Sequence, residues 1–347
     1  MGLPENKKIE LTSKYPKGKR NKITDVPGVT VGQVTLEDEE KHIHTGVTAI
    51  LPHQGNLFQD KVAAGVSIIN AFGKSAGLIQ IQELGTIETP IVMTNTFGVG
   101  TALNALTRYM LSQNEDIGAT TSTVNCVVTE CNDGVLNDIR GMHVTEDHVC
   151  KALETARKDF EEGAVGSGTG MVCMGLKGGI GSASRVVKIK EKEYTVGALL
   201  MSNFGSYGNL RIGGKPVAVP PREEDGKTVE PEKDKGSVII VLGTDLPLSS
   251  RQLNRVAKRA TVGLARVGSY LGNGSGDIAV AFSTANRIPH YCEEGLVDIK
   301  MTHDDALDCV FEAVAEAVEE AVISSLYHAK TTSGIRGKVI HSVCEYL

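Results

Sequence analysis

Short apolar runs separated by turn-forming polar residues and glycines recur along most of the chain. These runs are rich in β-branched residues and shorter than an ordinary helix, so they predict buried strands. The predicted strands lie at residues 47–51, 65–69, 91–94, 124–129, 194–201, 238–242 and 278–282.

A helical period appears between and after these runs, most clearly at residues 304–328. There Leu307, Val310, Phe311, Val314, Val318 and Val322 fall on one face of a helix. We expect Thr302 to cap this helix, and Asp304 and Asp305 to complement its N-terminal dipole. Two further helices are predicted at 146–162, closed by Gly163, and at 251–270, preceded by Ser249 and Ser250. The mixed order of strands and helices favours α/β layers.

Composition narrows the class of protein. The 347 residues carry a net charge of −6, which offers no basic field for nucleic acid, and no apolar run reaches the length of about 18 residues that a membrane span needs. The basic N-terminus has no apolar segment behind it, so we expect no secretory signal and a cytoplasmic protein. Seven scattered cysteines without C-x-x-C spacing suggest reduced thiols in core or neutral positions.

A charged segment at 222–235 departs from the pattern of strands and helices. Ten of its fourteen residues are charged, which predicts a solvated linker. Gly236 and Ser237 follow it, and then the apolar strand 238–242 begins. A flexible tether is therefore predicted to end at a serine that opens a buried strand.

This junction permits a particular chemistry. A serine hydroxyl needs a base, and cleavage of the chain just before Ser237 would free an α-amine of reference pKa about 8 that can serve as that base. Attack of the Ser237 hydroxyl on the Gly236 carbonyl would make the cut by an N-to-O acyl shift. A glycine suits the upstream position because it tolerates close approaches. The alternative interpretation is a simple turn ahead of a strand.

Two other segments carry polar groups at strand ends. Ser275 and Asp277 lie on a glycine-rich turn before the strand 278–282, on the same face if the turn is extended, where they could orient a nearby amine or hydroxyl. Asn203 follows the apolar run 197–202, and its amide suits an oxyanion donor. Each could equally be a turn residue that satisfies backbone groups.

Taken together, these segments resemble the DmpA family of self-processing aminopeptidases, which includes L-aminopeptidase/D-Ala-esterases and β-peptidyl aminopeptidases. The resemblance covers nearly the whole chain. It rests on ITDVPGVTVG at 23–32, TGVT at 45–48, FGKSAGL at 72–78, LGTIETP at 84–90, TNT at 94–96, GSGTGMV at 166–172, KGGIG at 177–181, and the segment from Gly236 to Asp277.

The resemblance implies an αββα sandwich, similar to N-terminal-nucleophile hydrolases but differently connected. It implies a single catalytic domain, 1–347, that cuts itself at Gly236–Ser237 into chains 1–236 and 237–347 and assembles into a homo-oligomer, a tetramer of processed protomers. Ser237 is then the nucleophile, Ser275 and Asp277 support its hydroxyl or amine, and Asn203 is the oxyanion donor. Some relatives carry Glu at the position of Asp277.

Substrate recognition falls on Glu130, which matches the family's acid that pairs with the free amino group of a small peptide or amino-acid amide. Some relatives have Tyr two residues later, where this chain has Asn132, whose amide could donate instead. No metal or other cofactor is implied. Two other functions stay open: acyl transfer to an amine, as in the similarly folded ornithine acetyltransferases, and an uncut binding module.

Competing motifs are weaker. Gly73-Lys-Ser-Ala-Gly77 fits the G-x-S-x-G elbow of α/β-hydrolases, with Ser75 as nucleophile, but no histidine stands out as its partner. The glycine-rich run 163–181 lacks dinucleotide-binding spacing, so we expect tight turns near the active site. His42, His44 and His53 lack metal-ligand spacing, and we expect them at the surface.

Overall fold

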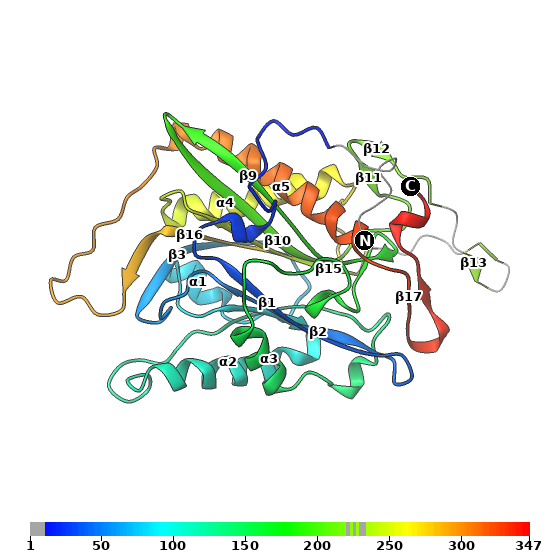
Figure 1. Cartoon of the computed structure of the whole chain (residues 1–347), viewed down its shortest axis with the longest axis horizontal. Coiled ribbons are helices and arrows are strands. Elements are labelled where there is room, and N and C mark those ends of the chain that lie inside the picture. The colour runs from blue at the N-terminus through cyan, green and yellow to red at the C-terminus, as the bar shows by residue number, and fades with distance from the viewer. Residues whose placement is uncertain (1–10, 220–222, 225–226, 229–233) are drawn as a thin grey trace.

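Two β-sheets pack face to face between two layers of helices (Figure 1). The structure is a computed structural model that describes residues 11–219, 223–224, 227–228 and 234–347. The larger sheet has six strands in the order β4-β3-β16-β15-β10-β9, and the smaller has four in the order β1-β2-β5-β6. The predicted αββα architecture is confirmed.

The strands of the two large sheets are β1 (Thr30–Asp38), β2 (Ile43–Leu51), β3 (Asp60–Ala71), β4 (Thr86–Ile87), β5 (Ile91–Asn95), β6 (Val127–Cys131), β9 (Gly179–Ile189), β10 (Lys192–Asn203), β15 (Ser237–Thr244) and β16 (Gly276–Pro289). Two-residue strands form small hairpins: β7 (Val172–Cys173) with β8 (Leu176–Lys177), β11 (Arg211–Ile212) with β12 (Lys215–Pro216), β13 (Glu223–Glu224) with β14 (Lys227–Thr228), and β17 (Thr332–Ser333) with β18 (Val339–Ile340). The α-helices are α1 (Leu78–Leu84), α2 (Val99–Gln113), α3 (Glu146–Glu154), α4 (Ser250–Arg266) and α5 (Asp308–Tyr327).

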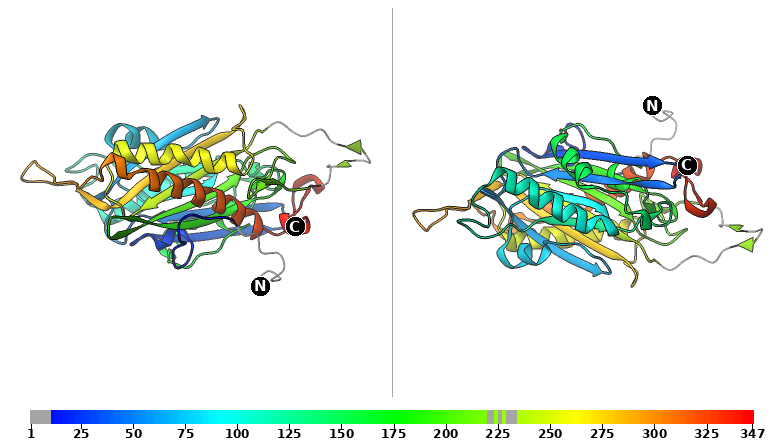
Figure 2. Two further views of the ribbon diagram at one scale, coloured as in Figure 1. Left: turned by 90° about the horizontal axis from the view of Figure 1, so that it is seen from above. Right: turned by 90° about the horizontal axis from the view of Figure 1, so that it is seen from below.

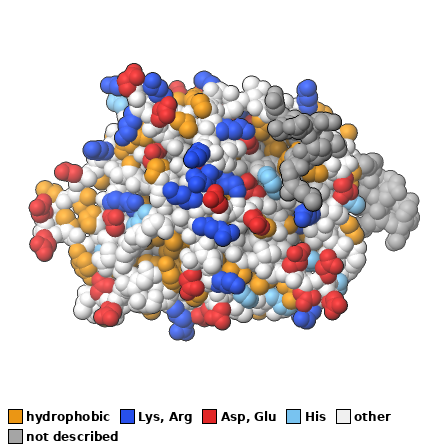
Figure 3. All heavy atoms as spheres, in the orientation of Figure 1, with side chains coloured by type: hydrophobic (Ala, Val, Ile, Leu, Met, Phe, Trp, Pro, Cys, Tyr) orange, Lys and Arg blue, Asp and Glu red, His pale blue; other side chains and the backbone are white. Residues whose placement is uncertain are grey.

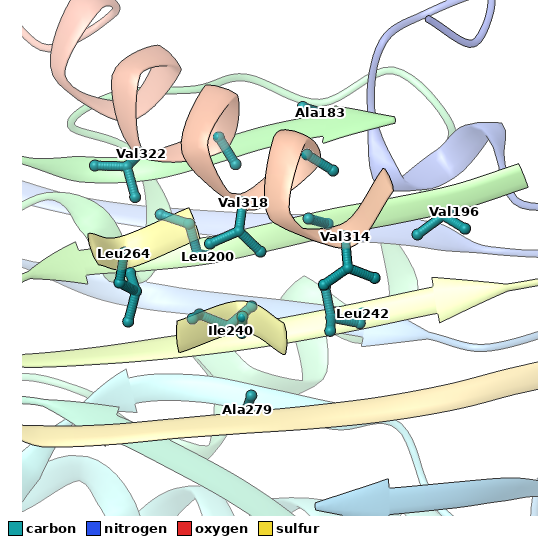
Figure 4. Close-up of a cluster of buried hydrophobic side chains, with 14 of the residues drawn as sticks. Ala183, Val196, Leu200, Ile240, Leu242, Leu264, Ala279, Val314, Val318 and Val322 are labelled. Atoms are coloured by element: carbon teal, nitrogen blue, oxygen red, sulfur yellow. The ribbon is translucent and has the colours of Figure 1, made fainter. Parts of the chain in front are cut away.

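The helices cover the outer faces of the sheets. Views from above and below show α4 and α5 over the six-stranded sheet and α2 with α3 over the four-stranded sheet (Figure 2). A buried apolar cluster fills each of the three spaces between layers. Val314, Val318 and Val322 of α5 meet sheet residues such as Leu200 and Ile240 in the outer space (Figure 4). The apolar face of α5 and one face of the larger sheet therefore pack together in this cluster.

Alternation along β15 decides where its first residue lies. Val238, Ile240 and Leu242 pack toward α4 and α5, whereas Ile239 and Val241 pack into the space between the sheets. Because side chains of a strand alternate between its faces, Ser237 lies on the side of Ile239, between the two sheets.

The helix predictions hold only in part. The helix predicted at 146–162 ends at Glu154, because the chain beyond it pairs with β1 through Arg157 and Val31 instead of continuing its own ladder. The helix predicted from 304 begins as a 3-10 turn at Asp304–Ala306, and α5 starts at Asp308.

The cap predicted at Thr302 is wrong, because its hydroxyl donates to the carbonyl of Pro247 at 2.8 Å. The predicted start of α4 is confirmed, since Ser249 caps it and its hydroxyl accepts from the Gln252 N–H.

Most of the predicted linker lies outside the described residues. Within it, the short strand Glu223–Glu224 pairs with Lys227–Thr228. Asp234 is only 3% exposed, so the solvated segment does not extend to Asp234.

None of the helices in the described part of the chain has the length and apolar character that a membrane span requires. The face in Figure 3 carries basic and acidic side chains intermixed, with several basic ones near its centre.

Candidate functional site

The predicted junction lies where three neighbouring strands of the larger sheet end. Ser237 opens β15, faces Asn203 at the end of antiparallel β10, and faces Gly276 at the start of parallel β16. Ser237 is 5% exposed and Asn203 is 6% exposed. The register of the sheet therefore brings together residues from three separate sequence segments.

The backbone around Gly236 is tightly held. Its carbonyl accepts a hydrogen bond from the Gly276 N–H at 3.0 Å. A Cβ at position 236 would lie 1.9 Å from the Asn203 carbonyl oxygen, closer than any real contact. Only glycine fits here, for the steric reason anticipated from the sequence.

The amide of Asn203 has a defined orientation. Its Oδ1 accepts from the Val172 N–H at 2.9 Å, and its Nδ2 donates to the carbonyl of Asn132 at 3.1 Å. A backbone N–H can only donate, so the oxygen of the amide is fixed on Val172 and the NH2 group faces Asn132. The NH2 group is the part that an oxyanion requires.

Ser275 and Asp277 form a pair, on the same side of the chain as predicted. The Ser275 hydroxyl donates to Asp277 Oδ1 at 2.6 Å, whereas Asp277 Oδ2 is buried without a hydrogen-bond partner. Burial raises the pKa of Asp277 to about 6, the Ser275 bond lowers it in part, and the charge of Asp234 raises it further.

Asp277 pairs with Val238 across β15 and β16, one residue beyond the pairing of Ser237 with Gly276. A backbone hydrogen bond from Val238 also lowers the pKa of its carboxyl group in part.

The sequence interpretation missed Cys131 as part of this site. Cys131 ends β6 of the smaller sheet and is fully buried against the Ser237 side of the larger sheet. Its thiol donates to the Met201 carbonyl at 3.7 Å. Burial raises the pKa of this thiol well above the ordinary value, and the nearby Ser237 hydroxyl lowers the pKa in part. Nothing in the sequence distinguishes Cys131 from the other six cysteines. Its position beside Ser237 arises only when the two sheets pack.

Glu130 lies one residue before Cys131, on the opposite face of β6, and is 4% exposed. Its Oε1 accepts from the Lys74 N–H at 2.8 Å, and its Oε2 accepts from the Thr96 hydroxyl. Thr96 is a second site residue that was not singled out from the sequence, although it belongs to the TNT motif at 94–96.

Asn132 is exposed, and its Oδ1 accepts from the Gly134 N–H at 2.9 Å. This bond leaves its NH2 group to face an acceptor. The predicted substrate-binding pair, Glu130 and Asn132, therefore flanks Cys131.

The loop after β3 connects the two halves of the site. The Phe72 N–H donates to the carbonyl of Ser275, and the Lys74 N–H holds Glu130. Ser75 lies in this loop between β3 and α1, so the strand-turn-helix context of the competing elbow motif is present. Its hydroxyl is buried without a hydrogen-bond partner.

The glycine-rich run beside the site forms tight turns, as expected. Lys177 is fully buried there and donates to the carbonyls of Met171 at 2.9 Å and Gly178 at 2.8 Å. Burial lowers the pKa of Lys177 to about 7. These turns present Val172 to Asn203.

The surface position expected for the three histidines is wrong for two of them. His44 is 1% exposed and His53 is 5% exposed, because His44 lies in β2 within the small sheet and His53 holds the loop that leads to β3. His42 is exposed.

Among the described residues, no group of three acidic, histidine or cysteine side chains is placed to hold a metal. All seven cysteines are free thiols.

Comparison with known proteins gives consistent matches. The model of peptidase family S58 matches residues 21–340. Two β-peptidyl aminopeptidases BapA are similar: that of Sphingosinicella microcystinivorans is 39% identical, covering 93% of this chain and 85% of the relative, and that of Sphingosinicella xenopeptidilytica is 36% identical, covering 94% and 85%.

Solved structures agree over nearly the full length. The PH0078 protein from Pyrococcus horikoshii OT3 superposes with a TM-score of 0.89 at 53% identity, covering 96% of this chain and 94% of that one. The L-aminopeptidase D-Ala-esterase/amidase from Ochrobactrum anthropi, described as a prototype of the serine aminopeptidases and a variant of the Ntn hydrolase fold, superposes with a TM-score of 0.86 at 37% identity, covering 96% and 93%.

Proposed function

Because the chain belongs to peptidase family S58 and is a peptide-bond hydrolase of the aminopeptidase type, we propose that it is a self-processing serine aminopeptidase with Ser237 as nucleophile. The membership confirms the resemblance to the DmpA family. The observation that carries the proposal is the peptide between half-buried Gly236 and buried Ser237, with the Gly276 N–H on its carbonyl and the Asn203 amide at the adjoining strand end.

Maturation begins with attack of Ser237 Oγ on the carbonyl carbon of Gly236. The carbonyl oxygen takes negative charge, which the Gly276 N–H stabilises from its observed position. The bond from Gly236 to the nitrogen of Ser237 then breaks, the nitrogen receives the hydroxyl proton, and an ester remains. Water hydrolyses the ester and gives chains 1–236 and 237–347, two parts of the single catalytic domain that the sequence predicts.

Turnover uses the amine that this cut creates. The neutral α-amine of Ser237 removes the proton from Oγ, as an N-terminal base does in general. The hydroxyl attacks the amide or ester carbonyl of the substrate, Asn203 Nδ2 stabilises the oxyanion, and the amine returns the proton to the leaving group. Water then releases the acyl group from Ser237.

Glu130 selects substrates that carry a free amino group. A buried carboxylate held by only a backbone N–H and a hydroxyl keeps acceptor capacity for an ammonium group. We therefore assign small peptides, amino-acid amides and esters as substrates, with Glu130 on the amino group and the Asn132 amide as a further donor. Asp277, with its free Oδ2, holds the α-amine of Ser237 in position.

The decisive experiment is the intact mass of the purified protein under denaturing conditions. The wild type is expected to give two fragments, one beginning at Ser237, and Ser237→Ala is expected to stay whole and inactive. Ser75→Ala is the matched control, since it removes the serine of the competing elbow motif, and it is expected to be cut normally. An uncut, active wild type would rule out self-processing. Product analysis with an added amine acceptor separates hydrolysis from acyl transfer.

We also propose that the protein is a cytoplasmic homo-oligomer. Support for assembly comes from the loop between β16 and α5, which projects from the body of the molecule (Figure 1). It exposes large apolar side chains, among them Leu296, Ile299 and Met301. Burial of these groups against another copy would remove apolar area from water. Light scattering of the wild type beside Leu296→Ser tests this assignment.

A further inference from the structure

Asp234 behaves unlike the rest of the charged segment to which it belongs. It lies three residues before Ser237 and was expected in solvent, yet it is only 3% exposed. A buried carboxylate is costly unless it is hydrogen-bonded, so its partners indicate why it is there.

Three backbone N–H groups converge on the Asp234 carboxylate. Its Oδ1 accepts from Gly205 at 3.0 Å and from Gly236 at 3.4 Å, and its Oδ2 accepts from Gly272 at 3.2 Å. Gly205 follows β10 and Gly272 precedes β16, the two strands that flank β15. Asp234 therefore joins the upstream side of the junction to both neighbouring strand ends.

The backbone of Asp234 is held as well. Its N–H donates to the hydroxyl of Tyr270 at 3.3 Å. A Cβ at Gly272 would lie 2.5 Å from the Cβ of Asp234, and a Cβ at Gly274 would lie 3.0 Å from its carbonyl oxygen. The glycines of the turn before β16 thus make room for the segment that leads to Gly236.

Both polar groups of Gly236 are consequently fixed, its N–H by Asp234 and its carbonyl by the Gly276 N–H. An attack on a carbonyl depends steeply on such positioning, since a misplacement of about 1 Å can cost about 100-fold in rate. We propose that Asp234 is a positioning residue for self-processing, which holds the Gly236 carbonyl in place for attack by Ser237. This inference rests on the proposed self-processing and adds to it a residue outside the predicted site.

By this assignment, the hydrogen bonds of Asp234 hold the Gly236–Ser237 peptide only in the uncut chain. After cleavage, residues 234–236 are the C-terminus of the long chain, and the Ser237 hydroxyl attacks substrate instead of Gly236. Removal of the Asp234 carboxylate is therefore expected to slow maturation more than it slows turnover by protomers that are already cut.

The test is the rate of processing of Asp234→Ala and Asp234→Asn, followed by intact mass in freshly purified full-length protein. Asp245→Ala is the matched control, because Asp245 accepts the Thr195 N–H at 2.7 Å just beyond the other end of β15. Melting temperature is measured for every variant, and turnover is expressed per cleaved protomer.

We expect Asp234→Ala to be cut about 10- to 100-fold more slowly than the wild type, with a smaller effect on turnover per cleaved protomer. Asp234→Asn keeps one acceptor oxygen and is expected to be intermediate, and Asp245→Ala is expected to be cut at the wild-type rate. Equal rates for wild type and both Asp234 variants would overturn the inference while leaving self-processing intact. Slowing that follows melting temperature in all three variants would also overturn it, as a general loss of stability. A wild type that is never cut would overturn self-processing itself, and this inference with it.

Discussion

At the scale of single residues, the two buried carboxylates Asp277 and Glu130 have different surroundings. Asp277 Oδ1 accepts from the Ser275 hydroxyl, and Asp277 Oδ2 is buried without a hydrogen-bond partner. Glu130 has a donor on each oxygen. Burial makes the charged form of Asp277 costly and raises its pKa to about 6.

Asp277 should make the uncut chain less stable as the pH rises. Its pKa is about 6 in the folded chain against 3.8 ordinarily, so between these values the folded chain keeps a proton that the unfolded chain has released. In the uncut Ser237→Ala background, we expect the change Asp277→Asn to gain up to about 3 kcal/mol in unfolding free energy, relative to its parent, between pH 4 and pH 7. Urea unfolding at both pH values measures the difference, and parallel pH curves for the two proteins would contradict it.

Glu130→Gln should impair recognition of the substrate amino group. The amide can still accept from the Lys74 N–H, so the fold is retained, but the charge opposite the ammonium group is lost. We expect kcat/KM for a free-amine substrate to fall about 10- to 1000-fold, mainly through KM. Steady-state kinetics beside Glu88→Gln provides the control, since Glu88 is a buried glutamate paired with Lys61 at the other end of β6. An equal fall in kcat/KM for Glu130→Gln and Glu88→Gln would show that Glu130 does not bind the substrate amino group.

At the scale of elements, the site depends on the register of β10, β15 and β16. The helix-layer and intersheet faces of these strands follow directly from alternation, and so Ser237 and Asn203 share the intersheet face. The element boundaries at 146–162 and 304–328 were less predictable, because tertiary pairing by Arg157 and the Thr302 bond to Pro247 replaced helical bonds.

Gly236→Ala tests this register. Its added Cβ would lie 1.9 Å from the Asn203 carbonyl oxygen, so the ends of β10 and β15 must separate. We expect processing to slow at least about tenfold, because the scissile carbonyl moves away from its donor. Gly100→Ala, in α2 with open space around its Cβ, is the control and should leave the rate unchanged. Normal cleavage of Gly236→Ala in a time course of intact mass would show that the observed contact is not restrictive.

At the scale of the whole molecule, the N-terminal segment is tied to the outer helical layer. Ser13 and Lys14 bond to Glu316 of α5, and Lys17 pairs with Glu320 at 2.5 Å. Arg185 of β9 pairs with the same two glutamates, at 3.0 Å and 2.7 Å, and is 1% exposed. One buried guanidinium thus joins the sheet, α5 and the start of the described chain.

Arg185→Met should destabilise the molecule without changing the chemistry of the site. It leaves two carboxylates without their buried partner, a change that typically costs about 3–5 kcal/mol. Arg20→Met, which removes a pair between Arg20 and the largely exposed Asp159, is expected to cost less than about 1 kcal/mol. Chemical denaturation of both variants checks the contrast, and a loss of Arg185→Met as small as that of Arg20→Met would contradict it.

The sequence alone determined the α/β class and the location of the junction. Apolar runs and helical periods are local properties, and they predict three helices and seven strands, among them the buried strand after Ser237, whereas the αββα order of layers came from the family resemblance. They did not predict β1, β9 and α2. Polar groups at strand ends pointed to Asn203, Ser275 and Asp277, and the family resemblance added Glu130. The structure places the first three at neighbouring strand ends and Glu130 against the loop after β3.

Only the tertiary structure decided which groups touch. It placed Cys131 near Ser237, Thr96 on Glu130, and Asp234 on the amides of Gly205 and Gly272. These contacts join segments that are far apart in sequence and have no periodic signal. It also oriented the Asn203 amide and paired Asp277 with Val238 of β15. Periodicity fixes the face on which a side chain lies, whereas its partner depends on how sheets and loops pack in three dimensions.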